Sequence, residues 1–301
     1  MHGIKKAISI SYIVLVSSFM FAAESIDMIP IPAGSFIRGL PDGIDNPLQT
    51  IFLSSFRMSR YEISFKEYME YFNTLDSDDT WNSFSKLLAV GKVTKDLDFH
   101  IPDEWPIWYV DYFDALLFCN WLSSKDGFCP VYSLIPHRSS MGYGDFEVLW
   151  DRTADGYRLP TEAEWEYVAR AGGKDLKIIS TDSDVVKEIG WFIENSEETL
   201  HPRGLKEPNL WGFYDLIGNV AEWCWDYYQP NYYSICSEEN PIGPESGFDD
   251  TAEIEPERTR TSRGGSFSTL IKWSNAFSRG PVHPGFKTTM GIRVVRSVIP
   301  D

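Results

Sequence analysis

The sequence predicts an α+β fold with a small antiparallel sheet, two or more helices and many loops. Strand patterns come first, two or three helical patterns follow, and strand patterns return near the end of the chain. There is no βαβ alternation and no repeat of fixed period, which favours helices segregated around a twisted antiparallel sheet. The 301 residues are 43% hydrophobic, which is enough for a large core. No Gly/Ser tract divides the chain, so we expect a single domain over residues 26–301.

The first elements of this domain are expected to be strands. Apolar residues alternate on both sides of a Pro-Ala-Gly turn within Met28–Gly39, which is typical of strand, turn and strand. Another strand pattern covers Ile51–Tyr61. The later assignments are a short strand at Pro130–Leu134, polar connections at Ile135–Asp155 and Pro230–Thr261, a strand that begins in Arg263–Phe267, and a final strand at Gly291–Ser297.

The helices carry their own start and stop signals. Ser64 and Glu67 have the spacing of a capping box, and Phe65, Tyr68, Met69 and Phe72 recur at helical spacing after Ser64. The segment GYRLPTEAEWEYVARAGG repeats the box with Thr161 and Glu164 and ends in two glycines, which supply a left-handed stop. The other assignments are a helix at Tyr112–Ser124, which Gly127 ends, and a loop or short helix at Ser180–Glu188.

The N-terminus has the pattern of an export signal. Lys5 and Lys6 precede an apolar run, Ile8–Ala23, and Ala23-Glu24-Ser25 fits a small-x-small cleavage site. We therefore expect residues 1–25 to be a signal peptide and the protein to reach the periplasm, the cell surface or the medium. An uncleaved anchor is the alternative. No other stretch is long and apolar enough to cross a membrane, so we expect no stable span after cleavage.

Composition restricts the partners. The 44 acidic and 27 basic side chains give a net charge of −17, which repels nucleic acid and anionic lipid at long range. The four cysteines are Cys119, Cys129, Cys224 and Cys236. In an oxidising compartment they could form two disulfides, with Cys119–Cys129 and Cys224–Cys236 as the pairs nearest in sequence. Free buried thiols are the alternative, and no zinc-site spacing is present.

Five motifs stand in an order that resembles a known family. MIPIPAGSFIRG, YRLPTEAEWEYVARAGG, WGFYDLIGNVAEWCWD, RGGSF and GIRVVR follow one another along the chain. Together they resemble the formylglycine-generating enzyme, or sulfatase-modifying factor, family. The resemblance implies a variant of the C-type-lectin fold over the whole exported chain. It does not settle function, since one fold serves several chemistries.

The resemblance also identifies what the chain lacks. Oxidase members of the family bind copper through a cysteine pair between RGGS and the final strand. In this chain that segment has no cysteine, and the expected positions hold Ser274 and Arg279. A hydroxyl and a guanidinium cannot replace thiolates as ligands of Cu(I). We therefore expect no copper and no oxidase activity. The alternative is a formylglycine-generating oxidoreductase with a displaced site that uses Cys224 or Cys236.

Without that pair, the same surface is expected to bind a protein or glycan ligand. The segment after RGGS mixes aromatic, cationic and small polar residues, as recognition surfaces do. It also resembles the variable region of lectin-fold display proteins that retroelements diversify, although ordinary non-catalytic members share its borders. Burial of its aromatics in the core and an accessory envelope role are the alternatives. The candidate ligand-binding residues are Phe267, Ser268, Thr269, Leu270, Trp273, Ser274, Asn275, Phe277, Arg279, His283, Phe286 and Lys287.

The motif IGNVAEW is a candidate site for a structural calcium ion. Hard cations take several oxygen ligands at once, and Asn219 and Glu222 lie three residues apart, with the carbonyl groups of Gly218 and Val220 beside them. In the oxidase members the matching stretch contributes to a calcium site. In the alternative interpretation Asn219 closes a turn and Glu222 pairs with an arginine such as Arg293.

Overall fold

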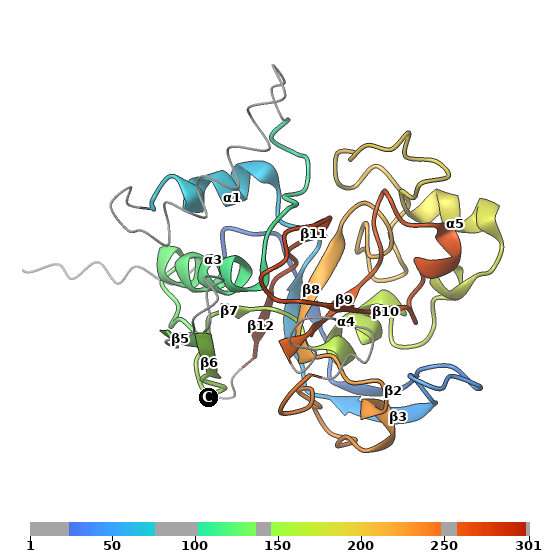
Figure 1. Ribbon diagram of the computed structural model, residues 1–301, viewed down its shortest axis with the longest axis horizontal. Helices are drawn as coiled ribbons and strands as arrows, with labels where there is room; N and C mark the ends of the chain where they lie inside the picture. Colours follow the sequence, from blue (N-terminus) through green and yellow to red (C-terminus); the bar gives the residue numbers. More distant parts are fainter. Residues whose placement is uncertain (1–23, 76–101, 137–145, 248–257, 299–301) are drawn as a thin grey trace, which may run out of the picture.

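The computed structural model describes residues 24–75, 102–136, 146–247 and 258–298, and residues 1–23 of the expected signal lie outside these ranges. Two four-stranded sheets lie near the middle of the molecule, with α1 and α3 on one side and α5 on the other (Figure 1). The fold is α+β, as predicted. Glu24 also belongs to the folded part, because its carboxylate pairs with Arg57 at 2.8 Å and Arg296 at 2.7 Å.

The first sheet brings both ends of the described chain together. Its strand order is β1-β4-β12-β7, and every neighbouring pair is antiparallel. Val295 of β12 lies opposite Met58 on one side and opposite Arg158 on the other. The strands are β1 (Met28–Ile31), β4 (Phe56–Ser59), β7 (Tyr157–Arg158) and β12 (Val295–Ser297).

The second sheet supports the loops that carry the candidate site. Its order is β10-β9-β8-β11, with β8 and β11 parallel and the other pairs antiparallel. Its strands are β8 (Ala221–Tyr227), β9 (Arg260–Arg263), β10 (Arg279–Val282) and β11 (Met290–Gly291). Two separate hairpins complete the strands: β2 (Gly34–Arg38) with β3 (Gln49–Leu53), and β5 (Tyr132–Pro136) with β6 (Phe146–Trp150).

Both predicted capping boxes are confirmed. Ser64 caps α1 (Phe65–Phe72) and Thr161 caps α4 (Glu162–Ala169), and in each case the glutamate three residues later bonds back to the cap. Asp111 caps the longer α3 (Tyr112–Lys125). The other helical elements are η1 (Lys177–Ile179), α5 (Ser183–Ile189), η2 (Tyr232–Ser234) and η4 (Ile271–Trp273).

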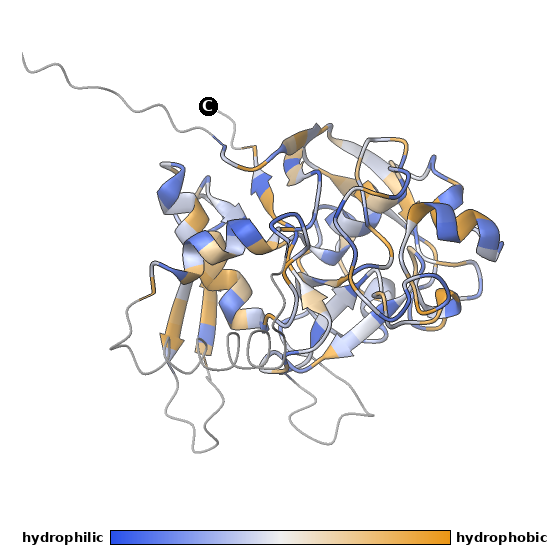
Figure 2. Ribbon diagram, turned by 90° about the horizontal axis from the view of Figure 1, so that it is seen from above, coloured by the Kyte–Doolittle hydropathy of each residue, from blue (hydrophilic) through white to orange (hydrophobic). Residues whose placement is uncertain are grey.

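The core has two parts, and α4 lies in one of them. One cluster gathers α1, α3 and the aromatic Trp223, while the other gathers the β2–β3 hairpin, α4 and the Ile217 turn. Every residue of α4 is buried, its three glutamates included. In Figure 2 the helical ribbons alternate between orange and blue, as expected where one side of a helix is buried. Within the described ranges, no helix is long and apolar enough to cross a membrane.

Several predicted strands were wrong in their bounds. The pattern over 51–61 is interrupted at Ser54–Ser55, so two strands form instead of one. The motif RGGSF does not begin a strand: β9 ends at Arg263, because Gly264 and Gly265 have φ values of 89° and 72°. The final motif is divided into β11 and β12. The predicted connection at 135–155 contains β6, and its residues 137–145 lie outside the described ranges.

Candidate ligand-binding face

The loop after β9 is the centre of the candidate site. It leaves the sheet through the two left-handed glycines and reaches η4 beside α5, in the orange-red part of Figure 1. The space at the turn is tight, because a Cβ added to Gly265 would lie 2.3 Å from the Oγ of Ser274. Ser274 is fully buried. The glycines and Ser274 therefore fix the path of this loop.

Hydrogen bonds to other parts of the fold hold the loop backbone. The amide of Phe267 donates to the carbonyl of Asn219 at 2.8 Å, and the Ser196 hydroxyl donates to the carbonyl of Phe267 at 2.8 Å. The amide of Ile193 donates to the carbonyl of Thr269 at 3.2 Å. The guanidinium of Arg263, at the end of β9, donates to the carbonyl of Ala276. These anchors use backbone groups of the loop, so they do not depend on its outward side chains.

A second set of anchors lies within the loop itself. The Thr269 hydroxyl accepts a hydrogen bond from the Ser266 amide at 3.1 Å, and the Ser266 and Thr269 hydroxyls lie 3.0 Å apart. The Asn275 carboxamide accepts from the amides of Phe277 and Ser278 at 2.9 and 3.0 Å. Thr269 and Asn275 were predicted to contact a ligand, and the structure gives both of them a role in shaping the loop.

The outward side chains form what we call the loop face, which consists of Ser268, Leu270, Lys272, Trp273 and the neighbouring Ile193. Trp273 is 60% exposed and Ile193 is 40% exposed. The ammonium group of Lys272 lies 4.4 Å from the centre of the Trp273 ring. Ile193 was missed by sequence reasoning, because it is brought to the loop only by the backbone bond to Thr269.

Other predicted aromatics lie around this face in different settings. Phe267 and Phe277 are half-buried, and the guanidinium of Arg170 lies 4.9 Å from the centre of the Phe277 ring. Phe286, on the loop after β10, is 47% exposed. His283 is buried, its Nδ1 accepts from the Gly285 amide at 3.2 Å, and its ring packs against Phe286 at 4.9 Å.

Arg279 is not available to a ligand, which corrects its predicted role. Its backbone is partly exposed, but its side chain is only 2% exposed. Its Nε and Nη2 donate to the two carboxylate oxygens of Glu162 at 2.6 and 2.9 Å. Arg263 donates to Glu162 at 3.1 Å and to Glu166 at 3.0 Å. A buried bidentate pair of this kind holds β9 and β10 against α4.

Lys287 is likewise committed inside the protein. Its ammonium group lies 2.6 Å from Asp114 and 3.3 Å from Asp111, and its side chain is 8% exposed. Both carboxylates sit at the start of α3, where the helix dipole favours negative charge. Burial and the nearby Asp114 raise the pKa of Asp111 to about 7, although Lys287 opposes this. The ammonium group of Lys287 therefore neutralises the buried carboxylates of Asp111 and Asp114 and is not available to a ligand.

The charges beneath the loop face are unevenly compensated. Burial disfavours ionisation of Glu162, but Arg279 and Arg263 outweigh it, so the pKa of Glu162 is lowered. Asp226 has the opposite balance: burial and the charge of Glu162 raise its pKa to about 7. The carboxylate of Asp226 accepts a hydrogen bond from the Glu162 amide at 2.8 Å. One acid of this cluster is thus held ionised while its neighbour titrates near neutrality.

Comparison with known proteins places the whole described chain in one family. A model of the "Sulfatase-modifying factor enzyme 1-like domain" matches residues 19–298. The chain belongs to the sulfatase-modifying factor family. The resemblance inferred from the five motifs is therefore confirmed.

Relatives within the sulfatase-modifying factor family carry different names. "Chaperone protein LppX" from Paenibacillus barcinonensis is 26% identical, over 90% of this chain and 89% of its own length. The "Formylglycine-generating enzyme" of Thermomonospora curvata is 26% identical, over 83% of this chain and 85% of its own length. The solved "Treponema denticola variable protein 1" is 24% identical, with a TM-score of 0.70 over 89% of this chain and 94% of that one. This last likeness establishes the fold, which is C-type-lectin-like as expected.

The predicted calcium residues of this family member lie in a buried acidic cluster, but two of them have other partners. The Asn219 carboxamide accepts from the His201 amide at 3.2 Å and donates to Glu62 at 3.0 Å. Glu222 accepts from Arg293 at 2.8 Å and from the Trp165 indole at 2.7 Å. Asn219, with a φ of 53°, therefore closes a turn, as the alternative interpretation held.

The same cluster contains one buried carboxylate oxygen without a partner and several carboxylates that burial affects. Asp215 is buried, and its Oδ1 has no hydrogen-bond partner within the described ranges. Burial and the charges of Asp215 and Glu222 raise the pKa of Glu62 well above its usual range, and burial raises that of Asp215 to about 6. The positive charges of Arg293 and Arg203 oppose the shift of Asp215, and that of Arg293 opposes the shift of Glu62. Among the residues that the structure describes, no three or more carboxylate, histidine or cysteine side chains are grouped as a metal site would require. Both oxygens of Glu222 also accept hydrogen bonds already, so the calcium site stays a prediction.

The four cysteines are all free thiols. Cys119 and Cys224 are buried, and burial raises the pKa of both thiols strongly. Cys236 is half-buried, and its Sγ accepts a hydrogen bond from Arg38 at 2.7 Å. Cys129 is exposed. The predicted pairs Cys119–Cys129 and Cys224–Cys236 are therefore not formed, and the alternative of free thiols holds.

Proposed function

We propose that this protein is an exported, non-catalytic member of the sulfatase-modifying factor family that binds a polypeptide through the loop face. The observation that carries the proposal is that different groups of the loop hold its shape and face the solvent. Backbone groups, Ser266, Thr269 and Ser274 hold its shape, whereas Trp273 and Lys272 point outward without an anchoring role. A rigid loop with an exposed aromatic residue binds at low ordering cost.

The name of one relative supports the ligand class. "Chaperone protein LppX" matches nearly the whole chain, and a chaperone acts on other polypeptides. The segment between RGGS and GIRVVR has no cysteine, which argues against the oxidase function of other relatives. The buried Cys224 thiol, whose pKa is raised, is a poor thiolate ligand for copper. Glycans remain a second ligand class that binding experiments would reveal.

Diversification of the loop is the finer proposal, supported by the fold that this chain shares with "Treponema denticola variable protein 1". Substitutions at Leu270, Lys272 and Trp273 would leave the anchoring contacts in place, and a substitution at Ser268 would remove only the 3.1 Å contact between its hydroxyl and that of Ser266. Sibling genes are expected to vary at these four positions and to keep Ser266, Thr269, Ser274 and Arg279 unchanged. Even divergence along the whole chain would contradict this proposal.

Calcium is proposed as a structural ion at the acidic cluster of Asp215 and Glu222. It would neutralise part of the negative charge of the buried carboxylates Glu62, Asp215 and Glu222. Export is proposed from the N-terminal segment, with a signal shorter than the predicted residues 1–25, because Glu24 and Ser25 make contacts within the fold. The final location would be the periplasm, the cell surface or the medium.

A peptide selection tests the binding function directly. A random peptide library is selected on the wild-type protein, and the Kd of each recovered peptide is measured by calorimetry on wild type, Trp273→Ala and Leu210→Ala. Leu210 is 69% exposed and lies outside the loop face, so its variant controls for loss of any surface apolar group. Trp273→Ala is expected to weaken binding by about tenfold or more.

Two results would overturn the proposal. In the first, the recovered peptides bind wild type and Trp273→Ala equally. In the second, the copper-loaded protein oxidises a cysteine peptide and loses this activity in Cys224→Ala or Cys236→Ala. The second result would establish the displaced oxidase site instead.

A further inference from the structure

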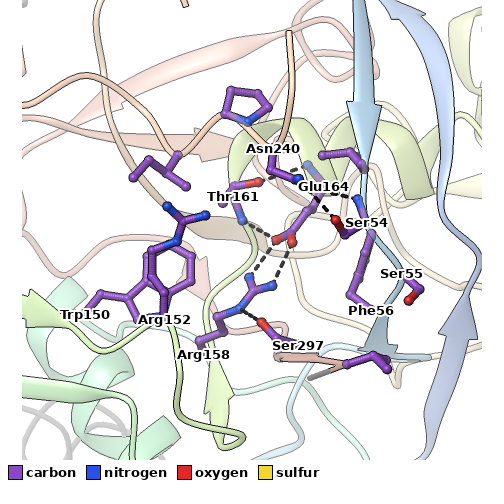
Figure 3. Close-up of a pocket in the computed structure, with 14 residues that line it drawn as sticks. Ser54, Ser55, Phe56, Trp150, Arg152, Arg158, Thr161, Glu164, Asn240 and Ser297 are labelled. Carbon is purple, nitrogen blue, oxygen red and sulfur yellow. Dashed lines mark hydrogen bonds and ion pairs between the residues drawn. The ribbon is translucent and has the colours of Figure 1, made fainter. Parts of the chain in front are cut away.

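A pocket of about 140 Å³ lies away from the loop segment, at the motif that begins α4. Four parts of the sequence enclose it: the β3–β4 turn, the stretch 150–164 from the end of β6 through β7 to the first turn of α4, the stretch 240–242, and the end of β12. Figure 3 shows the polar side chains of Arg158, Glu164 and Ser297 converging at one side of this pocket. None of the twelve residues predicted for ligand binding lines it.

The base of the pocket is a buried ion pair. Two nitrogens of Arg158 donate to the two carboxylate oxygens of Glu164, each at 2.7 Å (Figure 3). Arg158 also donates from Nε to the hydroxyl of Ser297 at 3.1 Å, and the Thr161 amide donates to Glu164 at 2.9 Å. Residues Arg158 and Glu164 are 3% and 8% exposed. Fixed charged groups next to a cavity can orient a polar ligand without reorganising.

The walls of the pocket are also fixed. The Asn240 carboxamide accepts from the Ser54 amide at 2.8 Å and donates to the Ser54 hydroxyl at 3.1 Å. The Asn240 amide donates to the carbonyl of Phe52 at 2.9 Å, which attaches this stretch to β3. Asn240 has a φ of 43°, a conformation that asparagine tolerates better than most residues. The hydroxyl and amide groups of Ser54, Ser55 and Asn240 thus line one wall of the pocket, which these hydrogen bonds hold in place.

The opposite wall is aromatic and cationic. The indole of Trp150 is half-buried, with the guanidinium of Arg158 at 5.1 Å and that of Arg152 at 5.9 Å from its ring. Arg152 is exposed, and together with the neutral Arg158–Glu164 pair it leaves one positive charge in the lining. This local positive charge contrasts with the net charge of −17. It favours an anionic ligand at the pocket.

An indole, several hydroxyls, a carboxylate and Arg152, which has no ion pair among the described residues, are complementary to a sugar ring that carries a carboxylate. The apolar face of the ring would pack on Trp150, its hydroxyls would bond to Glu164, Ser54 and Ser55, and its carboxylate would pair with Arg152. We propose that this pocket binds a single acidic sugar residue, of the uronic or sialic acid class, at the end of a glycan. The proposal does not depend on the loop face.

The proposal is tested with glucuronic acid, N-acetylneuraminic acid and glucose as free sugars, and with the folded full chain. Saturation-transfer NMR and calorimetry are expected to detect an acidic sugar with a Kd on the order of 1 mM and to detect glucose at least tenfold more weakly. Arg152→Gln, at an exposed site, is expected to raise the Kd about tenfold. Trp150→Ala is expected to abolish binding while circular dichroism confirms its fold.

Two control variants make the result specific. Lys66→Gln removes another exposed cation outside the pocket, and Trp273→Ala removes the aromatic of the loop face; both are expected to bind the acidic sugar as wild type does. Absence of binding for all three sugars, equal Kd values for glucose and glucuronic acid, or unchanged binding by Arg152→Gln would each overturn the proposal. A loss of binding in Trp273→Ala alone would place the sugar on the loop face instead.

Discussion

Arg279 of β10 and Glu162 at the start of α4 form a bidentate ion pair, with nitrogen–oxygen distances of 2.6 and 2.9 Å, although 116 residues separate them in the sequence. Both side chains are almost entirely excluded from solvent. The pair joins α4 to the sheet that supports the loop face. It therefore restrains the position of the surface where we propose binding.

Removal of this pair should be costly. Arg279→Met leaves part of the Glu162 charge buried without its main partner, and the free energy of unfolding is expected to fall by about 3 kcal/mol in urea titrations. Lys125→Met, which breaks the exposed pair with Glu70, is expected to change stability by less than about 1 kcal/mol. Equal effects of the two variants would contradict a dominant role for the buried pair.

Truncation of Trp273 should change stability little, whereas truncation of Trp165 should reduce it strongly. Trp273→Ala is expected to change the free energy of unfolding by less than about 0.5 kcal/mol, because the side chain is largely exposed. Trp165→Ala is expected to cost about 3–5 kcal/mol, because its ring is fully buried and its indole donates to Glu222. A large loss in Trp273→Ala would show that this ring belongs to the core.

Stability should depend on pH through Asp226. Its folded pKa, raised to about 7, exceeds the value of about 4 in an unfolded chain. The folded state therefore binds more protons between these values, so the free energy of unfolding should fall as pH rises from about 4 to 7, by up to about 1.4 kcal/mol per pH unit. Glu162, whose pKa is lowered, acts oppositely at lower pH and destabilises the fold as it protonates.

Asp226→Asn checks this assignment. The amide oxygen can still accept the hydrogen bond from the Glu162 amide, but the group no longer titrates. Urea titrations at pH 5, 6, 7 and 8 should give a flatter pH dependence for the variant than for wild type. Parallel curves would assign the slope to other groups, such as Asp111, whose pKa is also raised to about 7.

Calcium should stabilise the protein through Asp215. At a calcium concentration about 100 times Kd, the thermal midpoint is expected to rise by roughly 5 °C, and EDTA should reverse the rise. Asp215→Asn should remove most of the difference between the two conditions. Asp184→Asn, at a 91% exposed side chain, should keep it. A midpoint that calcium leaves unchanged in wild type would count against this ion.

The thiols should react in the order of their exposure. An aromatic disulfide reagent is expected to modify Cys129 first and Cys236 more slowly, and to reach Cys119 and Cys224 only after unfolding. The intact mass of the native protein should equal that of the fully reduced chain. A mass deficit that disappears on reduction would indicate a disulfide and contradict the free state of these cysteines.

Local signals in the sequence predicted local structure well. The capping boxes at Ser64 and Thr161 are complete within four residues, so the helix starts could be read directly. The break at Ser54–Ser55 and the turn at Gly264–Gly265 were missed because apolar alternation continued across the first and the strand pattern was extended into the second. The double glycine was the signal that could have corrected the latter.

The candidate site was harder to predict, because its charges are paired across long sequence distances. Arg279 and Lys287 have the composition of ligand contacts, yet their partners lie on α4 and at the start of α3. No spacing rule reveals such a pairing. Exposure of Trp273 and burial of Ser274 depend equally on contacts that only the folded chain brings together.

Strand β12 lies between β4 and β7, so the first sheet cannot close until the polypeptide has been synthesised through Ser297. Until then β4 lacks one neighbour and β7 lacks the only strand that it pairs with in this sheet. A nascent chain would therefore hold an open edge until β12 has emerged, and this pairing of strands far apart in the sequence should make folding slow. Deletion of β12 would be expected to yield a product that proteases degrade.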